Sequence, residues 1–456
     1  MIFERNPMKI SRMLKKRSPA QIIVLYYFLA VTIATILFQL PIALQEGVEL
    51  SVIDAVFLSV SAVSVTGLSV VDITETFSVT GYFLLMFVMQ FGGIGVMTLG
   101  TFLWLIFKRK IGFKERRLIM TDQNQVSFAG LVFLLKQVLI LFLAIEAIGA
   151  IVLGLYLMKD YPTVPEAFLQ GLFMSISAAT NAGFDIVGAS LMPYAHDYFI
   201  QLVNIALIIF GSIGFPVLIE VKRCLLRKNV NKAFQFSLYT KLTTVTFFGL
   251  IVVGAIGILA LEHQHFLTGK NWHESFFYAL FQSVTTRNAG LATMDVSQFA
   301  DATLFLLCAL MFIGASPSSV GGGIRTTTFA ILVLFLIHYA RGNQHVKVFR
   351  REIHDDDIKK SLVVAMIALM VCGIGIFLLS ISESFSITAI IFEVCSAFGT
   401  TGLSMGITAD LTAFGKVVIM ILMFIGRIGI LSFIFMLGGE KEPDRYRYPT
   451  ERVIIG

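Results

Sequence analysis

The stretch "FLSVSAVSVTGLS", residues 57–69, is a short apolar run that ends in a glycine loop, and three similar stretches follow it along the chain. They read "FMSISAATNAGFD" from Phe173, "FQSVTTRNAGLA" from Phe281 and "FEVCSAFGTTGLS" from Phe392. The third copy is one residue shorter, so the register of its first half stays open. Repetition of this kind predicts one structural unit used four times. The glycines of the four loops are Gly67, Gly183, Gly290 and Gly402.

The composition predicts a helical integral membrane protein. Of 456 residues, 57% are hydrophobic and 14% are charged, which is too apolar for a soluble domain. Long apolar runs flank each short run, and the short alternating segments of a transmembrane barrel do not occur. The four cysteines lack a pairing pattern, and no HExxH motif, Walker loop or strand-borne GxSxG motif is found. A membrane enzyme or scaffold, the rival class, would need a buried catalytic constellation that the sequence does not contain.

The positive charges divide the chain into parts. Six Lys and Arg residues lie in each of the segments 1–20, 108–125, 222–241 and 339–360, and four more lie in the tail. By the positive-inside rule these segments and both termini face the cytosol. The charges flank helices instead of forming one face, so no nucleic-acid partner is expected. The expected organisation is a basic N-terminus (1–20), repeat 1 (21–107), repeat 2 (127–226), repeat 3 with a broken inner helix (237–338), repeat 4 (361–438) and a tail (439–456).

Each repeat is expected to hold an outer helix, a re-entrant pore helix and an inner helix. The short runs, of about a dozen residues, cannot span the membrane. Irregular backbone at that depth is tolerated only inside protein or beside water. The predicted fold is therefore an all-α integral membrane protein, with eight transmembrane helices and four re-entrant pore helices around a central pore.

The glycine loops are predicted to form a cation filter. Glycine permits backbone angles that turn carbonyls inward, helix C-termini carry partial negative charge, and carbonyl oxygens can replace the hydration shell of an alkali cation. A single such glycine would favour a simple turn, but four in matched context favour a filter. The candidate ion-binding residues are Val65, Thr66, Gly67, Thr180, Asn181, Ala182, Gly183, Asn288, Ala289, Gly290, Thr400, Thr401 and Gly402.

The third inner helix contains "GASPSSVGGGIR", residues 314–325, inside an apolar run of 40 residues at 299–338. Proline removes a helix hydrogen bond and each glycine costs about 1 kcal/mol of helix propensity, so the helix is expected to break. A kinked structural helix is one interpretation; we favour a flexible loop beneath the filter that obstructs the pore. Shortening it should raise flux without changing selectivity, since the filter is untouched. The candidate gate residues are Gly314, Ala315, Ser316, Pro317, Ser318, Ser319, Val320, Gly321, Gly322 and Gly323.

Other inner-helix features have simpler interpretations. The small residues of "MQFGGIGVMTLG" (89–100) and "IIFGSIGFPVL" (208–218) suffice for close helix packing. Arg427, in the fourth inner helix, is too costly to face lipid. It is expected to face the pore, where it would repel cations or bond to the gate loop; a salt bridge with Glu220 or another buried acid is the alternative. Arg287 is expected behind the filter, donating to backbone carbonyls or to Glu393.

The loops "SVTGLS", "ATNAGFD", "TRNAGLA" and "GTTGLS", together with the inner helices, resemble the Trk/Ktr/HKT superfamily of potassium transporters over roughly residues 20–440. The resemblance is greatest to the bacterial KtrB-type membrane subunits. It implies potassium uptake across the bacterial plasma membrane by the ion-translocating subunit of a Ktr-type system, and an intramembrane gate at 314–323. Glycine at all four filter positions favours potassium, because serine at the first accompanies sodium selectivity in the family. A sodium-conducting or poorly selective member is the alternative.

The same resemblance implies the partners. They are a second copy in a homodimer with one pore per subunit, the lipid bilayer, and a cytosolic RCK-type (KtrA/KtrC-like) regulatory ring. Potassium is the expected ion and sodium a candidate activator. Nucleotide is expected only through the partner ring.

Overall fold

The computed structural model describes residues 19–95, 131–226 and 234–438, and four separate residues of the tail, Tyr446, Pro449, Glu451 and Ile454. The basic N-terminal segment, the first basic loop and most of the tail lie outside the described residues. Within the described part the regular secondary structure is helical, apart from one two-stranded hairpin.

The same sequence of helices, a long helix, a short helix and a second helix, occurs four times along the chain. We call each such set of three helices a quarter. The four long helices are α2 (Pro19–Phe38), α8 (Leu131–Leu157), α12 (Leu238–Glu262) and α16 (Asp355–Ser382). The short helices are α3 (Val52–Ser64), α9 (Val164–Ala179), α13 (Trp272–Thr285) and α17 (Ile387–Gly399). The second helices are α5 (Val79–Ile94), α10 (Tyr198–Ser212), α14 (Asp301–Ile313) and α18 (Ala413–Ile428). The connections that follow three of the glycine loops hold α4 (Ile73–Thr76), η1 (Met192–Tyr194) and η2 (Val296–Gln298).

Length and apolar composition give four described helices that can cross a membrane, or five if one bent pair counts as a span. These four are the long helices of the quarters. The sequence predicts eight spans; within the described residues the second helices are individually shorter, at 16, 15, 13 and 16 residues.

The short helices begin at capping residues. The side chain of Ser51 accepts a hydrogen bond from the Asp54 N–H, and Thr163 and Ser386 cap α9 and α17 in the same way. Asn271 and Glu274 form a capping box at α13. Such caps satisfy backbone N–H groups that the helix leaves unpaired, so the first residue of each short helix is set by its local sequence.

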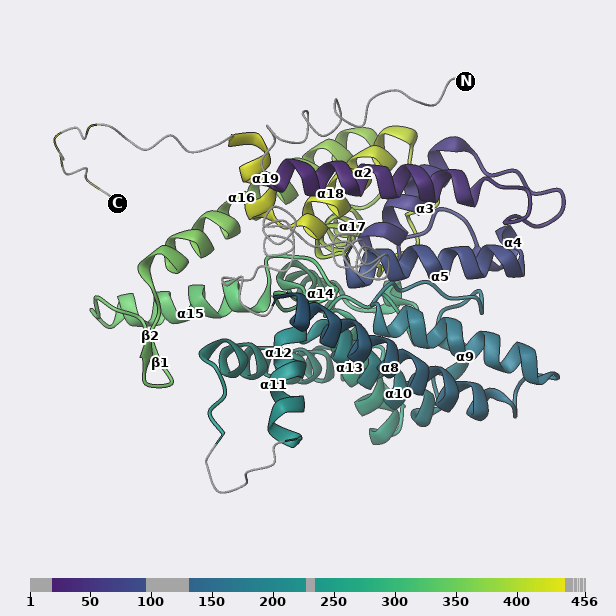
Figure 1. Ribbon diagram of the computed structural model, residues 1–456, viewed down its shortest axis with the longest axis horizontal. Coiled ribbons are helices and arrows are strands. Elements are labelled where there is room, and N and C mark those ends of the chain that lie inside the picture. The colour runs from purple at the N-terminus through teal and green to yellow at the C-terminus, as the bar shows by residue number, and fades with distance from the viewer. Residues whose placement is uncertain are drawn as a thin grey trace.

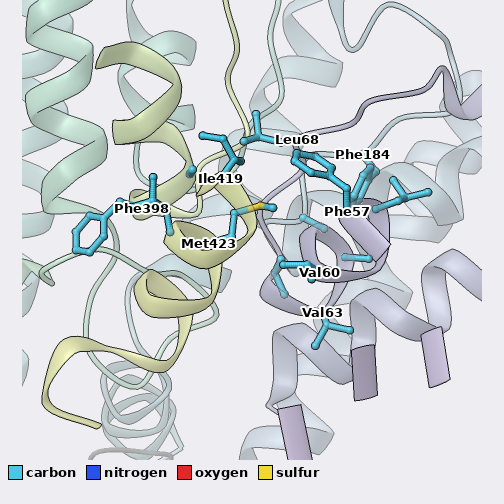
Figure 2. Packing of buried hydrophobic residues seen from close by; sticks show 14 of the residues in the cluster. Phe57, Val60, Val63, Leu68, Phe184, Phe398, Ile419 and Met423 are labelled. Carbon is cyan, nitrogen blue, oxygen red and sulfur yellow. The ribbon is translucent and has the colours of Figure 1, made fainter. Parts of the chain in front are cut away.

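The quarters close into a ring. The second helix of each quarter packs against the short helix of the next: α5 on α9, α10 on α13, α14 on α17 and α18 on α3. The last of these pairs joins the end of the chain to its beginning, as α18 and α3 show in Figure 1. Phe57 and Val60 of α3 lie in the same buried cluster as Ile419 and Met423 of α18 (Figure 2).

Helices α10 and α18 also break at glycines, a feature that the sequence analysis assigned only to the third quarter, and α5 ends at one. Helix α11 (Phe215–Leu225) leaves α10 at an angle of 106°. Helix α19 (Ile430–Gly438) follows α18 after Gly429. Gly95, Gly214 and Gly429 have φ of 93°, 102° and 85°, which a right-handed helix cannot contain. Close packing alone was therefore an incomplete interpretation of the motif in α10, where Gly211 packs closely against the Ala179 carbonyl but the helix also breaks at Gly214.

The third quarter has the longest break. Helix α14 ends at Ile313 and α15 (Thr326–Ala340) begins after twelve intervening residues, 314–325. Beyond α15, strands β1 (Lys347–Val348) and β2 (Arg351–Glu352) form a hairpin that leads into α16. The hairpin and the adjoining ends of α15 and α16 project from the helix bundle at the left of Figure 1.

Candidate functional site

The four loop glycines lie in contact around one ring. A Cβ atom built on Gly67 would lie 3.0 Å from the Cα of Gly183, and one on Gly183 would lie 3.2 Å from the Cα of Gly290. The corresponding distances are 3.1 Å from Gly290 to Gly402 and 3.1 Å from Gly402 back to Gly67. Side chains are thus excluded at all four positions, and the backbones of four distant segments meet in chain order.

The backbone near each glycine is strained in the same way. The residue two positions before each glycine is left-handed, with φ of 57° at Val65, 54° at Asn181, 115° at Asn288 and 50° at Thr400. The glycines themselves have φ of 91°, 72°, 71° and 91°. Non-glycine residues in such conformations are strained and gather at functional sites. The third copy shares the pattern, so its register matches the others at the glycine.

A hydroxyl braces every loop, and the sequence analysis missed this set: Ser61, Ser177, Thr285 and Ser396. Their backbone carbonyls accept from the N–H before the glycine at 2.8 Å in all four loops. The hydroxyls of Ser61 and Ser396 accept from the glycine N–H at 3.1 Å. Those of Ser177 and Thr285 donate at 2.6 Å to the carbonyl after the glycine. The signal in the sequence was a hydroxyl residue six positions before the glycine in three copies and five positions before it in the third. The residue that the third copy lacks therefore lies between the hydroxyl residue and the glycine.

Replacing Thr285 by Val is expected to lower the free energy of unfolding by about 1–3 kcal/mol, because it leaves the buried Leu291 carbonyl without its donor. Thr285→Ser keeps the hydroxyl and is the matched control. Thermal unfolding of the purified protein in detergent compares the two. An equal loss of stability in both variants would show that the hydroxyl does not brace the loop.

Arg287 of the third glycine loop is fully buried. Its Nη2 donates to the carbonyl of Leu310 on α14, one of the two kinds of partner expected from the sequence. Glu393, the other expected partner, accepts instead from the hydroxyls of Ser404 and Thr408. Arg287 thus ties the third glycine loop to the helix that precedes the break.

The loop formed by residues 314–325, hereafter the break loop, is packed against the ring and the second quarter. The Ser316 N–H donates to the Ser212 carbonyl at 3.0 Å, and the Val320 N–H donates to the Gly211 carbonyl at 3.1 Å. The Tyr239 hydroxyl donates to the Pro317 carbonyl at 2.6 Å. Most of the loop is buried, including Ala315, Ser316 and Val320 at 0% exposure. This is a folded, hydrogen-bonded segment and not an unstructured linker.

Two arginines hold the break loop. Arg427 of α18 donates through Nη1 to the Val320 carbonyl and through Nη2 to the Gly92 carbonyl at the end of α5. Arg325 donates to the carbonyls of Gly321 and Ser316. Two roles were expected for Arg427, and the hydrogen bond to Val320 agrees with the one in which it bonds to the loop. Glu220, the alternative partner, accepts from the Ser237 N–H at 3.1 Å.

Both guanidinium groups also line a cavity of about 60 Å³ beside the break loop, together with Tyr27, Gly92 and Ser319. A cation in this space would meet two positive side chains with no compensating acid among the described lining residues. The break loop and two positive side chains therefore lie together around this cavity, an arrangement that is unfavourable for a cation there.

Glu146, which the sequence analysis did not single out, is a buried acid in the span of α8. Gln90 of α5 donates to its Oε2 at 2.6 Å. The signal was a lone carboxylate in a long apolar run, a placement that is costly without a partner. The pair ties the second quarter to the first near the end of α5.

The family model for the cation transport protein TrkH matches residues 9–444. This chain belongs to the TrkH cation transport family. It is a multi-pass membrane protein of a transport family and not an enzyme. Its relatives include Ktr system potassium uptake protein D of Bacillus subtilis, 58% identical over 98% of this chain and 100% of that protein. Ktr system potassium uptake protein B of the same organism is 38% identical over 96% of this chain and 97% of that protein.

A third relative carries a broader name. The potassium/sodium uptake protein NtpJ of Enterococcus hirae is 32% identical over 98% of this chain and 99% of that protein. Among solved structures, the potassium transporter TrkH from Vibrio parahaemolyticus superposes with a TM-score of 0.72 at 18% identity, covering 92% of this chain and 85% of that one. At that identity the likeness establishes the fold alone.

Proposed function

We propose that this protein takes up potassium across the bacterial plasma membrane as the ion-translocating subunit of a Ktr-type system. The observation that carries the proposal is the closed ring of four glycines, each preceded by a left-handed residue. The names of the relatives at 58% and 38% identity support potassium as the ion. In this proposal the four quarters are four repeats, each with a pore helix, around one pore.

The filter is formed by the backbone of Val65–Gly67, Asn181–Gly183, Asn288–Gly290 and Thr400–Gly402. The C-terminal ends of four short helices converge there and favour a cation. Rings of carbonyl oxygens replace the hydration shell of potassium as it enters. The ion is cargo and not a resident cofactor. The hydroxyl braces hold the carbonyl positions, which favours one ion size over others.

The rival function is sodium conduction or poor selectivity. The name of the relative at 32% identity, which includes both potassium and sodium, supports this alternative. Glycine at all four ring positions supports potassium. Reversal potentials of the protein in planar bilayers, with potassium replaced by sodium on one side, separate the two. A shift of tens of millivolts supports potassium selectivity, and no shift supports the rival.

We assign the gate to the break loop, with Arg427 as the residue that helps to hold it closed. The loop is bonded to α10 and α18 and abuts the ring. A cytosolic RCK-type ring, docked on the basic loops and the β1–β2 hairpin, would open the gate by moving α15. It can do so only through a difference in affinity for the two states. The proposal includes a homodimer, cytosolic termini and nucleotide bound by the ring alone, with sodium as a candidate activator.

Arg427→Ala is expected to raise potassium flux through the isolated subunit in liposomes about tenfold, because the packed loop loses a charge-assisted hydrogen bond. Arg427→Lys separates the two roles of this residue. Lysine keeps the positive charge but cannot reach two carbonyls in the same fork geometry. Flux like that of the alanine variant indicates that Arg427 ties the loop, whereas flux like that of the parent indicates that it repels cations.

A further inference from the structure

The break loop is hydrogen-bonded to the ring itself. The Gly322 N–H donates to Asn288 Oδ1 at 3.0 Å, and the Thr400 hydroxyl donates to the same oxygen at 3.0 Å. Asn288 and Thr400 are the left-handed residues that precede Gly290 and Gly402. One carboxamide oxygen thus joins the loop to two of the four glycine segments.

This contact is buried and closely packed. Asn288 is fully buried, and its Nδ2 has no hydrogen-bond partner within the described part of the chain. A Cβ atom built on Gly321 would come within 2.5 Å of Asn288 Cγ, and one built on Gly322 within 2.6 Å of Thr400 Oγ1. If the loop left, the buried Oδ1 would lose one of its two donors, and an unsatisfied buried acceptor is costly.

The loop also replaces a contact that the other quarters make directly. Gly92 packs against the Val63 carbonyl, and Gly211 and Gly426 likewise pack against carbonyls at the ends of α9 and α17. In the third quarter the equivalent Gly314 packs against the Gly322 carbonyl of the loop. In the first, second and fourth quarters this contact comes from the short helix of the same quarter. In the third quarter the break loop supplies it instead.

Resting on the proposed function, we propose that Asn288 couples the gate to the filter: the packed loop holds the filter in its tight potassium-binding form, and departure of the loop weakens potassium binding. The strained φ of 115° at Asn288 persists because its surroundings hold it. By reciprocity, potassium in the filter stabilises the packed loop by the same factor. Asn288 is a positioning residue in this scheme. The sequence-based expectation that shortening the loop leaves selectivity unchanged stays a prediction, although the Gly322–Asn288 hydrogen bond shows that the loop contacts the third glycine segment.

The test is a double-mutant cycle on potassium affinity, measured by isothermal titration calorimetry of the full chain in detergent. Deleting residues 317–320 of the loop is expected to raise the potassium dissociation constant about fivefold or more. In an Asn288→Gly background the same deletion should change it by less than about twofold, because the link is already absent. Glycine suits the positive φ at this position, so backbone strain does not confound the result.

Two variants control for general damage to the filter. Asn181→Gly alters the matching residue of the second quarter, which has φ of 54°, is fully buried and has no side-chain hydrogen bond to the described residues. The loop deletion should still weaken binding about fivefold in this background. Asn288→Asp keeps an acceptor oxygen and should keep the loop dependence.

An unchanged dissociation constant after loop deletion in the parent overturns the proposal. So does an undiminished loop effect in Asn288→Gly, or its equal loss in Asn181→Gly. A parent chain that binds potassium without any loop effect contradicts the coupling alone. A parent chain that binds no potassium, or binds sodium equally well, contradicts the proposed function instead.

Discussion

A folded protein with a shortened break loop is expected to pass potassium without any cytosolic partner, about 10- to 100-fold faster than the parent. The packed loop is held by hydrogen bonds to α10, to Tyr239 and to Arg427. Each contributes about 0.5–1.5 kcal/mol, or more where a charge is involved. Removing residues 317–320 eliminates several of these bonds and the steric obstacle together, which is why the effect exceeds that of Arg427→Ala.

The measurement is the initial rate of potassium uptake into liposomes that hold the isolated subunit. A matched control shortens the turn at Gly342, a glycine that also has positive φ but no neighbour within 4 Å. Both variants are checked for a folded, monodisperse state by size-exclusion chromatography. A folded deletion variant that conducts no faster than the parent would place the gate elsewhere and leave the loop with a structural role.

Gly67→Ser is expected to reduce the preference for potassium over sodium about tenfold. The added Cβ would meet the Ala182 carbonyl and lie 3.0 Å from the Gly183 Cα, so the ring must expand or distort. Overpacking of this kind costs about 1–3 kcal/mol, which is enough to shift carbonyl positions between the optimum for one ion and that for another. A Cβ atom at Gly290 would meet the Thr401 carbonyl and the Gly402 Cα. Gly290→Ser should therefore reduce the preference for potassium in the same way.

Gly406→Ser is the matched control for both filter variants. Gly406 follows the fourth loop and has φ of 88°, close to the 91° of Gly67, but nothing lies within 4 Å of its Cβ position. It therefore carries the same backbone strain without the contact around the ring. Permeability ratios from reversal potentials should change in Gly67→Ser and stay near the parent value in Gly406→Ser. Equal changes in the two would mean that strain, and not the ring, sets selectivity.

The sequence predicted the elements that depend on local pattern. The short helices end near their glycines as expected, because an apolar run of fixed length must turn where glycine permits it. The break between Ile313 and Thr326 was also predictable from the proline and the run of glycines. The match with the TrkH family agrees with the resemblance seen in the glycine loops.

The sequence did not predict features that depend on contacts between distant segments. The glycines near the break at Gly214 were interpreted as a packing motif, because a glycine in an apolar run serves either purpose. The sequence offered the break loop as a partner of Arg427, but no local pattern identifies the carbonyls of Val320 and Gly92 as the acceptors. The link from Asn288 to Gly322 is of the same kind.

The central claim is that potassium is bound on the axis of the glycine ring. Diffraction from crystals grown in thallium or rubidium in place of potassium tests it most directly, because both ions scatter anomalously and resemble potassium in size. We expect an anomalous peak enclosed by the loops of Gly67, Gly183, Gly290 and Gly402, and its loss when sodium replaces the heavy ion. A fully occupied heavy-ion site elsewhere in the protein, with none on this axis, would contradict the account.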